Sequence, residues 1–352
     1  MRVLIVTTDW LDAISSRKNL SDWAHKHYGW NVDLISPPSE NGVNKKDINT
    51  TYRKHYIQKK RGLTISNCVH LRSIIAKNSY NIIILRGLES IILYSLISRK
   101  RKVKIIFLLT GLGRLFDEKL PFSTIVRFIY KQSLRIITNI HKATIIVQNK
   151  EDQKDLNFKN INIINGSGVP IPKVRGKKNY NGIKIVTASR LVESKGIHEI
   201  IDLAQRIQNK PNISYTILGD YSKLNFKLIE LIQSLNTSSN VKFLGHVDDI
   251  SPHLNDAIFA FYPTRYREGV PRFLIESTSY GLIPITTTAT GCEQFLNHGI
   301  KYNSVSQVIK CMEELKEDTL RKMSYKNLKL FEEKFEETKV FKALIDIVKR
   351  AH

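Results

Sequence analysis

Residues 183–196 read IKIVTASRLVESKG and carry the pattern that decides the fold: an apolar run, a polar turn and a glycine that opens a helix. The run Ile183–Ala188 is rich in β-branched residues, as expected for a parallel strand that is buried on both faces. A helical stretch near 197–209 follows at once. A strand followed directly by a helix is the repeating unit of a doubly wound α/β sheet.

The same unit recurs on both sides of this stretch. In the first half, strands are expected at Val3–Thr7, Val32–Ile35, Ile82–Leu85, Ile105–Leu109, Ile145–Val147 and Ile161–Ile164, and helices near 12–27, 64–78, 89–99 and 122–140. In the second half, further strands are expected at Ser214–Leu218, Val241–Leu244, Ile258–Tyr262 and Ile283–Thr286, with helices near 225–235, 272–280 and 304–318 and a helical tail over 319–351.

The polar segment 172–182 contains few apolar residues and is predicted to be a linker. We therefore predict an α/β protein with two Rossmann-like doubly wound domains that face a cleft. The domains cover residues 1–172 and 183–335, and a C-terminal helix over 336–352 could cross back to the first domain. Ligands of such sheets bind at the carboxyl ends of the strands.

Composition narrows the class of protein. The chain has 352 residues with 42% hydrophobic residues, enough for two cores. It opens on a strand pattern without a signal-peptide core, and no apolar run approaches the roughly 18 residues of a membrane span. A cytoplasmic or peripheral protein is expected. The cysteines Cys68, Cys292 and Cys311 are odd in number and widely spaced, which favours neither a disulfide framework nor a zinc site.

The formal net charge of +23 is distributed unevenly. Residues 1–175 hold 30 Lys and Arg against 12 Asp and Glu, whereas residues 176–352 hold 25 against 20. A basic half indicates an anionic partner, which could be nucleic acid, an anionic membrane surface or a phosphorylated substrate. Charge that serves solubility alone is the remaining explanation.

Two carboxylates stand eight positions apart in the stretch REGVPRFLIE, residues 267–276. Gly269 is expected to free the backbone, and Pro271 suits the first turn of a helix. Glu268 should therefore lie on a loop at a helix mouth and Glu276 within the first turns. Hydrogen-bond acceptors beside free helix amides suit a polyhydroxylated ligand such as a sugar or a ribose, although two solvated glutamates would give the same spacing.

Two cations follow the strand Ile183–Ala188. Arg190 can bind two oxygens with its planar guanidinium, Lys195 adds a point charge, and the helix after Gly196 adds amides. This combination suits a diphosphate. Two surface cations beside a glycine turn are the alternative.

Taken in order, these motifs resemble a known family. Arg190-Leu191 with Lys195-Gly196, Ile217 to Asp220, Val241 to His246, and Glu268-Gly269 with Pro271, Glu276 and Gly281 are similar to the nucleotide-sugar domain of retaining GT-B glycosyltransferases of family 4. In the first half, Thr110 to Gly113, Ala143 to Asn149 and Asn165 to Val169 resemble bacterial members that build O-antigen, capsule or other glycan units on undecaprenyl diphosphate. The resemblance covers roughly residues 1–297.

The resemblance implies roles for individual residues. Arg190 and Lys195 would bind the donor diphosphate, and Glu268 would hold the donor sugar with the amides of Gly269, Val270 and Pro271. Glu276 would accept from the ribose, Gly219 with Leu244, His246 and Val247 would flank the base, and Gly111 and Gly113 would let the first domain approach the diphosphate or acceptor. The catalytic set is thus Glu268, Arg190 and Lys195. The family needs no metal and no other cofactor, in agreement with the lack of an Asp-x-Asp motif.

The chain departs from this family at two places in the first half. The segment 9–17 stands where relatives carry a glycine-rich loop after the first strand, and Arg86 stands near the end of the strand at 82–85 where relatives often place a histidine. The contacts of an atypical N-terminal loop over 9–17 cannot be assigned by analogy.

Basic residues also accompany the apolar helix expected over 122–140. Arg127, Lys131 and Arg135, with Arg114 before them, would form a basic amphipathic face for an acceptor or an anionic inner leaflet, and the run Arg99 to Lys102 adds charge. An ordinary core-facing helix with a solvated cationic side is the alternative.

These observations predict a retaining glycosyltransferase that moves a hexose or N-acetylhexosamine from a nucleotide sugar, probably a UDP-sugar, to a lipid-linked saccharide in surface polysaccharide biosynthesis. It would act at the inner face of the cytoplasmic membrane. A nucleotide-sugar epimerase or phosphorylase-like enzyme on the same fold is one alternative. A non-catalytic protein that binds polyanions or nucleic acid is another, although no nucleic-acid recognition motif is present.

Overall fold

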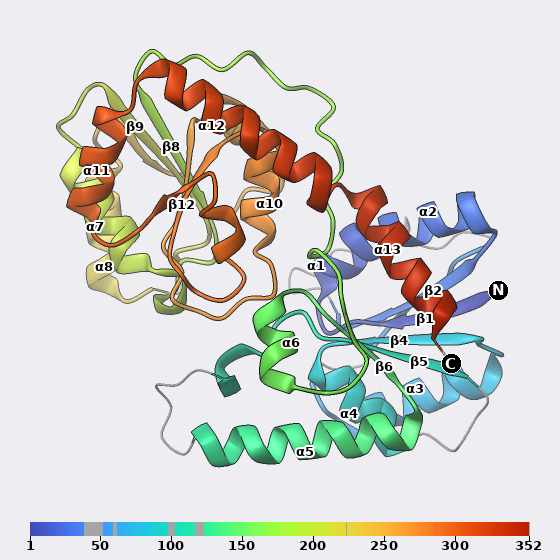
Figure 1. Cartoon of the computed structure of the whole chain (residues 1–352). Helices are drawn as coiled ribbons and strands as arrows, with labels where there is room; N and C mark the ends of the chain where they lie inside the picture. The colour runs from blue at the N-terminus through green and yellow to red at the C-terminus, as the bar shows by residue number, and fades with distance from the viewer. Residues whose placement is uncertain (39–51, 59–61, 98–102, 117–122, 223, 352) are drawn as a thin grey trace. The chain divides into compact units, whose positions relative to one another are not determined.

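The computed structural model describes all residues except 39–51, 59–61, 98–102, 117–122, 223 and 352 (Figure 1). The chain divides into two compact units, which are described separately: residues 1–168 with 338–352, and residues 169–337. The basic run Arg99 to Lys102 lies outside the described residues.

The first unit is built on a parallel sheet in the order β3-β2-β1-β4-β5-β6-β7. Its strands are β1 (Arg2–Val6), β2 (Asn31–Ser36), β3 (His55–Ile57), β4 (Ile82–Arg86), β5 (Lys104–Leu108), β6 (Thr144–Val147) and β7 (Ile161–Ile163). Its helices are α1 (Trp10–Asp12), α2 (Lys18–Tyr28), α3 (Ile65–Lys77), α4 (Leu88–Ile97), α5 (Ser123–His141), α6 (Lys150–Leu156) and α13 (Glu337–Arg350).

Side chains of β1 alternate between the two faces of this sheet. Val3 and Ile5 belong to a core that also contains α2 and α13, whereas Leu4 and Val6 belong to a core formed with α3, α4 and Leu134 of α5. Helices therefore cover both faces, as buried parallel strands require. The C-terminal helix contributes Phe341, Leu344 and Val348 to the first of these cores.

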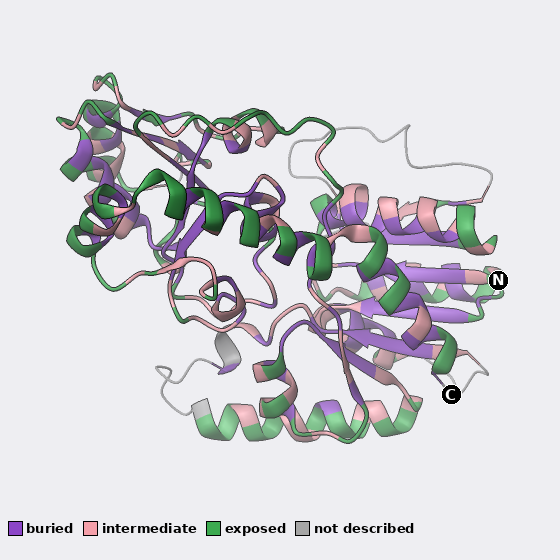
Figure 2. Cartoon of the chain, turned by 45° about the horizontal axis from the view of Figure 1, so that its top comes forward, coloured by how far each residue is buried: buried purple, intermediate pink, exposed green. Residues whose placement is uncertain are grey.

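The second unit contains a parallel sheet in the order β10-β9-β8-β11-β12-β13. Its strands are β8 (Ile183–Ala188), β9 (Ile213–Leu218), β10 (Val241–Phe243), β11 (Phe259–Tyr262), β12 (Ile283–Thr286) and β13 (Ile300–Lys301). Its helices are α7 (Ile197–Ile207), α8 (Phe226–Leu235), α9 (Ser251–Asp256), α10 (Arg272–Ser279), α11 (Val305–Glu314) and α12 (Glu317–Leu330). Purple strands between helices with green outer sides in Figure 2 show this layering in each unit.

The helix expected near 12–27 is present and begins earlier, at Trp10, so most of the segment that was expected to be an atypical loop over 9–17 is helical. Asp9 is a helix N-cap whose carboxylate accepts the amides of Leu11 and Asp12, and the chain continues through α1 and a π-helical stretch, Ala13–Arg17, into α2. A side chain that accepts hydrogen bonds from the free amides of the first turn stabilises the start of a helix. The sequence pattern also missed β3, α6, α9 and the two-residue strand β13.

Candidate active site

Each sheet reverses its strand order once, and candidate residues gather where it does. In the second unit, β9 and β10 lie beyond β8 on one side, while β12 and β13 lie beyond β11 on the other. The carboxyl ends of the strands at such a reversal are where open α/β sheets bind ligands. Lys195 comes shortly after β8, and Tyr262 is the last residue of β11.

Lys195, Tyr262 and Glu268 form a buried polar group at this edge, here called the lysine cluster. Lys195 Nζ forms an ion pair with the Glu268 carboxylate and donates to the Tyr262 hydroxyl at 2.9 Å. The Tyr262 hydroxyl donates to Glu268 Oε1 at 2.8 Å. Removing an ammonium from water costs several kcal/mol unless it meets a counter-charge, so Glu268 is what makes a buried Lys195 tolerable.

Tyr262 was missed by the sequence pattern. Burial raises the pKa of Tyr262 well above its ordinary value, and the negative charge of Glu268 raises that pKa further. The phenol therefore stays protonated and acts as a donor to Glu268. A tyrosine that ends an otherwise apolar strand, six residues before a glutamate, is the signal that could have found it.

Close backbone contacts hold the lysine cluster in place. Gly196 has φ +78°, and a Cβ there would lie 2.5 Å from the Pro263 carbonyl oxygen, so the Lys195 turn is pressed against the chain that follows β11. Gly291 has φ +90°, and a Cβ there would lie 2.3 Å from the Gly269 carbonyl oxygen. Gly269 itself is absent from the positive-φ residues of the described chain, so the expectation that it frees the backbone is wrong, and Gly291 has that role.

Glu268 lies on the loop before α10, and Glu276 lies one turn inside that helix. Pro271 precedes the first helical residue, and no side chain caps the helix start. Glu276 pairs with Arg272 at 2.7 Å, and burial raises the pKa of its carboxyl group. The predicted arrangement of the two glutamates around a helix mouth is therefore present.

The remaining candidates of the second unit lie on loops at the same sheet edge. Arg190 is exposed after β8, and its charge offsets a small part of the rise that burial causes in the pKa of Tyr262. Gly219 follows β9 with φ +154°, and a Cβ there would lie 2.0 Å from the Ser189 carbonyl oxygen. Its amide donates to the Gly245 carbonyl at 2.7 Å, which joins the two predicted base-flanking loops.

The side chains on the loop after β10 differ in exposure. Leu244 is 44% exposed, and Val247 is partly packed against the core. His246 is exposed and pairs with Asp248, with 3.2 Å between Nε2 and Oδ1. No side chain of this loop is fixed strongly enough to define a base pocket by itself.

In the first unit, the predicted glycines lie after β5. Gly111 has φ +116° and Gly113 has φ +63°, so both hold conformations that favour glycine. Arg114 follows in a short 3-10 turn, Gly113–Phe116, and its side chain lies outside the described part of the structure.

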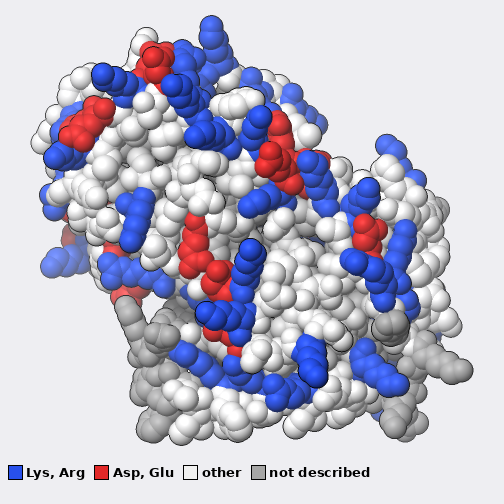
Figure 3. Space-filling model, in the orientation of Figure 1, with Lys and Arg blue, Asp and Glu red and all other residues white. Residues whose placement is uncertain are grey.

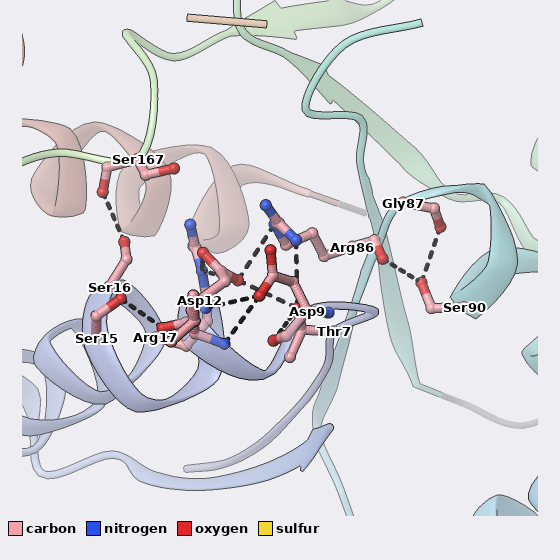
Figure 4. Close-up of polar contacts among 11 residues, drawn as sticks. Thr7, Asp9, Asp12, Ser15, Ser16, Arg17, Arg86, Gly87, Ser90 and Ser167 are labelled. Carbon is pink, nitrogen blue, oxygen red and sulfur yellow. Dashed lines mark hydrogen bonds and ion pairs between the residues drawn. The ribbon is translucent and has the colours of Figure 1, made fainter. Parts of the chain in front are cut away.

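The first sheet carries its own polar group at its reversal between β1 and β4 (Figure 4). Thr7, Asp12, Arg17 and Arg86 form this group, here called the arginine cluster. Arg17 Nε donates to both Asp12 carboxylate oxygens, at 3.2 and 3.0 Å, and Arg86 Nε lies 3.2 Å from Asp12 Oδ2. The sequence pattern singled out Arg86 as a departure from the family but did not assign it to a site.

Helix α5 has a largely exposed outer side (Figure 2, lowest helix). The large apolar side chains exposed on it are Ile125, Val126, Phe128, Ile129, Ile136 and Ile140. Arg127 and Lys131 are half-buried on the opposite stripe, while Arg135 is exposed and stacks over the Phe158 ring at 5.1 Å. The outer side is thus more apolar and less basic than the sequence pattern suggested.

Lys and Arg side chains are spread over the visible face of the molecule rather than gathered in one patch (Figure 3). Within the described ranges, no helix is long and apolar enough to cross a membrane. The same residues include no group of three or more His, Cys, Asp and Glu that could hold a metal ion.

Comparison with known proteins agrees with this geometry. A model described as glycosyl transferases group 1 matches residues 172–330, and one described as glycosyl transferase 4-like matches residues 18–149. Each half of the chain thus matches a model of glycosyltransferase domains, and the two parallel sheets have the GT-B fold. It is a transferase enzyme.

Individual relatives are distant. An uncharacterised glycosyltransferase of Methanocaldococcus jannaschii is 34% identical over 113 residues, which are 32% of this chain and only 27% of that protein. Sucrose-phosphate synthase from Thermosynechococcus elongatus superposes with a TM-score of 0.80 at 10% identity, over 99% of this chain and 98% of the other. Anabaena HepE, in complex with UDP and glucose, superposes with a TM-score of 0.74 at 12% identity, over 99% of both chains. At such identities, the two superpositions show the fold alone.

Proposed function

We propose that the protein transfers a hexose or N-acetylhexosamine from a nucleotide sugar, most simply a UDP-sugar, with retention of anomeric configuration. The observation that carries the proposal is the lysine cluster. It brings a cation and a carboxylate together at the strand reversal of the second sheet, within the segment that matches the group 1 model. HepE, which shares the fold, is described with UDP and glucose, and this supports a UDP-sugar as the first donor to test.

Each candidate residue has a role in this proposal. Lys195 and Arg190 bind the donor diphosphate and stabilise the charge that develops on it as the bond to the sugar breaks. Glu268 accepts hydroxyl groups of the donor sugar, and the free amides at the start of α10 assist it. Glu276 accepts from the ribose, and the loops of Gly219 and Leu244–Val247 flank the base.

The chemistry needs no nucleophile from the protein. In a front-face displacement, the acceptor oxygen bonds to the anomeric carbon on the side that the diphosphate leaves. The diphosphate takes the electron pair of the broken bond and the proton of the acceptor hydroxyl. Lys195 and Arg190 suffice to stabilise this leaving group, so the reaction is proposed to be independent of metal ions and cofactors.

The acceptor is proposed to be a saccharide on undecaprenyl diphosphate, used to build a surface polysaccharide at the inner face of the cytoplasmic membrane. Two observations support a peripheral membrane enzyme: the positive balance of residues 1–175 and the exposed apolar side of α5. Apolar side chains enter the interface, while cations attract anionic lipids. Gly111, Gly113 and Arg114 are the proposed neighbours of the acceptor.

The donor is tested by calorimetric titration with UDP, GDP and their common sugars at moderate salt. We expect saturable binding of one nucleotide and loss of that binding in Arg190→Ala/Lys195→Ala. Binding of none of these nucleotides by the wild type would contradict the proposal.

Membrane association is tested with liposomes of phosphatidylglycerol or phosphatidylcholine. Replacing two exposed residues, Phe128→Ser/Ile129→Ser, should lower partition into the anionic liposomes at least about tenfold, because each buried apolar side chain contributes about 1.5–3 kcal/mol. The matched control is Phe226→Ser in the second unit, where an equally apolar side chain is 74% exposed. A wild type that ignores anionic liposomes at low salt would rule the idea out.

A further inference from the structure

The arginine cluster occupies the same topological place in the first sheet as the lysine cluster occupies in the second. Thr7 follows β1 and Arg86 ends β4, the two strands between which the order of the first sheet reverses. Likewise, Lys195 follows β8 and Tyr262 ends β11. Since ligands of doubly wound sheets bind at this point, the arginine cluster lies where the first unit would hold its substrate.

Asp12 is the fixed centre of the cluster. Burial alone would raise the pKa of Asp12, but the charges of Arg17 and Arg86 hold the pKa of this carboxyl group below its ordinary value. Arg17 is itself 2% exposed and uses Nε on both carboxylate oxygens, and the Thr7 hydroxyl adds a hydrogen bond at 3.2 Å. Asp9 nearby is exposed, and its carboxylate is engaged by the amides of the helix start.

Arg86 makes fewer hydrogen bonds to Asp12 than Arg17 does. Its Nε lies 3.2 Å from Asp12 Oδ2 but is buried without hydrogen-bond geometry to any acceptor in the described chain. The only hydrogen bond of its side chain to a described residue runs from Nη1 to the Thr7 hydroxyl, at 3.4 Å. The side chain is 15% exposed, so part of the guanidinium is accessible. Figure 4 shows it reaching from the end of its strand toward Asp12.

The backbone under Arg86 is also held. The Ser90 hydroxyl lies 2.8 Å from the carbonyl oxygen of Arg86 and 2.9 Å from that of Gly87, and the Gly87 amide donates to Leu108 at 3.0 Å. A buried N–H without a partner costs free energy. Because the backbone and the side chain of Arg86 are both held by contacts, the guanidinium loses little entropy when it binds an oxyanion.

We propose that Arg86 is a specificity-determining residue that binds an oxyanion of the acceptor, so that the acceptor is acidic near its reacting end. This inference rests on the proposed glycosyl transfer. The diphosphate of the donor is assigned to Arg190 and Lys195 in the second unit, which leaves Arg86 to the other substrate. A carboxylate and a phosphate both accept two N–H groups from one guanidinium, and the experiment distinguishes them.

The test uses three small probes: glucose, glucuronate and glucose 6-phosphate. Their binding is followed by ligand-observed NMR at about 0.15 M salt, so that long-range attraction by the basic protein is screened. The full chain carries Arg190→Ala/Lys195→Ala, which removes the donor-site cations. Arg86→Gln and Arg86→Lys are then added one at a time. The matched control is Arg2→Gln, since Arg2 makes an ion pair with Asp33 at 2.8 Å at the opposite end of the same sheet.

We expect at least one acidic probe to bind and glucose not to bind. Arg86→Gln should weaken the binding of the acidic probe roughly tenfold to a hundredfold. Arg86→Lys should weaken this binding less, and Arg2→Gln should leave it unchanged. Binding of glucose 6-phosphate alone identifies a phosphate, binding of glucuronate alone a carboxylate, and binding of both a general oxyanion site. No binding of either acidic probe, or equal losses in Arg86→Gln and Arg2→Gln, would overturn the proposal.

A separate titration distinguishes this inference from the proposed function. With Arg190 and Lys195 intact, Arg86→Gln should leave the dissociation constant of UDP unchanged. Loss of UDP binding in Arg86→Gln would instead assign Arg86 to the donor and overturn its role toward the acceptor. Failure of the wild type to bind any nucleotide would count against the proposed function and leave the probe result to stand by itself.

Discussion

The lysine cluster and the arginine cluster stand at equivalent points of two similar sheets, yet their charges are satisfied differently. Lys195 meets a carboxylate and a hydroxyl, so its charge is matched within the protein. Arg86 shares Asp12 with Arg17 and keeps a buried N–H without a hydrogen bond to the described residues. The comparison shows that equivalent positions in two doubly wound sheets can carry different polar groups, because the side chains at the strand ends differ.

The largest expected effect comes from breaking the lysine cluster. Glu268→Gln removes the counter-charge of Lys195 and replaces one of the two acceptor oxygens by an NH2 donor, and we expect turnover of the nucleotide sugar to fall by at least about a hundredfold. The rate at which free nucleotide is released measures this turnover.

The matched control is Glu313→Gln, which breaks the exposed Lys210–Glu313 pair of the same unit, 2.7 Å long. Exposed pairs contribute about 0–1 kcal/mol, so neither turnover nor stability should change much. Full turnover in Glu268→Gln would remove Glu268 from the active site.

A backbone substitution tests whether the loop after β9 depends on its close contact with Ser189. Gly219→Ala should lower the free energy of unfolding by roughly 1–3 kcal/mol, because both its φ and its contact with Ser189 exclude a Cβ. Gly245→Ala is the control, since its φ is +69° but no atom lies within 4 Å of the added carbon. Denaturant unfolding should therefore show a larger loss for Gly219→Ala, and equal losses would show that the contact with Ser189 is unimportant.

A substitution of Glu276 tests the recognition of the ribose independently of the recognition of the diphosphate. Glu276→Ala should weaken the binding of UDP by about tenfold, which is the usual cost of losing a hydrogen bond to a charged acceptor. It should weaken 2′-deoxy-UDP less, and calorimetry of both nucleotides measures the difference. An unchanged preference for UDP over its deoxy analogue would place the ribose elsewhere.

Lys178 is a half-buried cation whose hydrogen bonds to described residues go to carbonyl groups and not to a carboxylate. Its Nζ donates to the carbonyls of Leu254, Asn255 and Ala257 at 2.8, 3.0 and 2.6 Å, and burial lowers its pKa to about 7. Carbonyl groups carry no full charge, so they offset less of the desolvation cost than Glu268 does for Lys195.

This lowered pKa predicts a dependence of stability on pH. Between about pH 7 and about pH 10, the unfolded chain binds more protons at Lys178 than the folded chain does, so stability should rise with pH across this window. Lys178→Met should remove that rise, which is seen by comparing the unfolding free energies of the two proteins at several pH values. Parallel curves for the two proteins would contradict the shifted pKa.

Much of the fold could be predicted from the sequence because buried parallel strands appear as continuous apolar runs. The strands β1, β4, β5, β6, β11 and β12 show this character most clearly. The edge strand β3 could not be found in this way, because His55 to Ile57 are only half-buried and form no apolar run. The helix expected near 12–27 begins at Trp10, and its start was placed too late because the cap at Asp9 was overlooked.

The candidate site was predictable only where its residues belong to short motifs. Arg190, Lys195, Glu268 and Glu276 have characteristic neighbours in the sequence. Tyr262 lies in an apolar strand, and Gly291 acts through a contact with a loop that is 22 residues away in the chain. The arginine cluster joins Asp12 and Arg17 to Arg86 across the reversal of the sheet, and only the strand order brings them together.

The proposed contact of Lys195 with the diphosphate of a nucleotide can be measured by comparing the binding of UDP with that of UMP. Their difference in affinity isolates the contacts of the second phosphate. We predict that the wild type prefers UDP by at least about tenfold, and that Lys195→Ala loses most of this preference while its affinity for UMP is little changed. An unaltered preference in Lys195→Ala, or a wild type that binds neither nucleotide, would contradict the account.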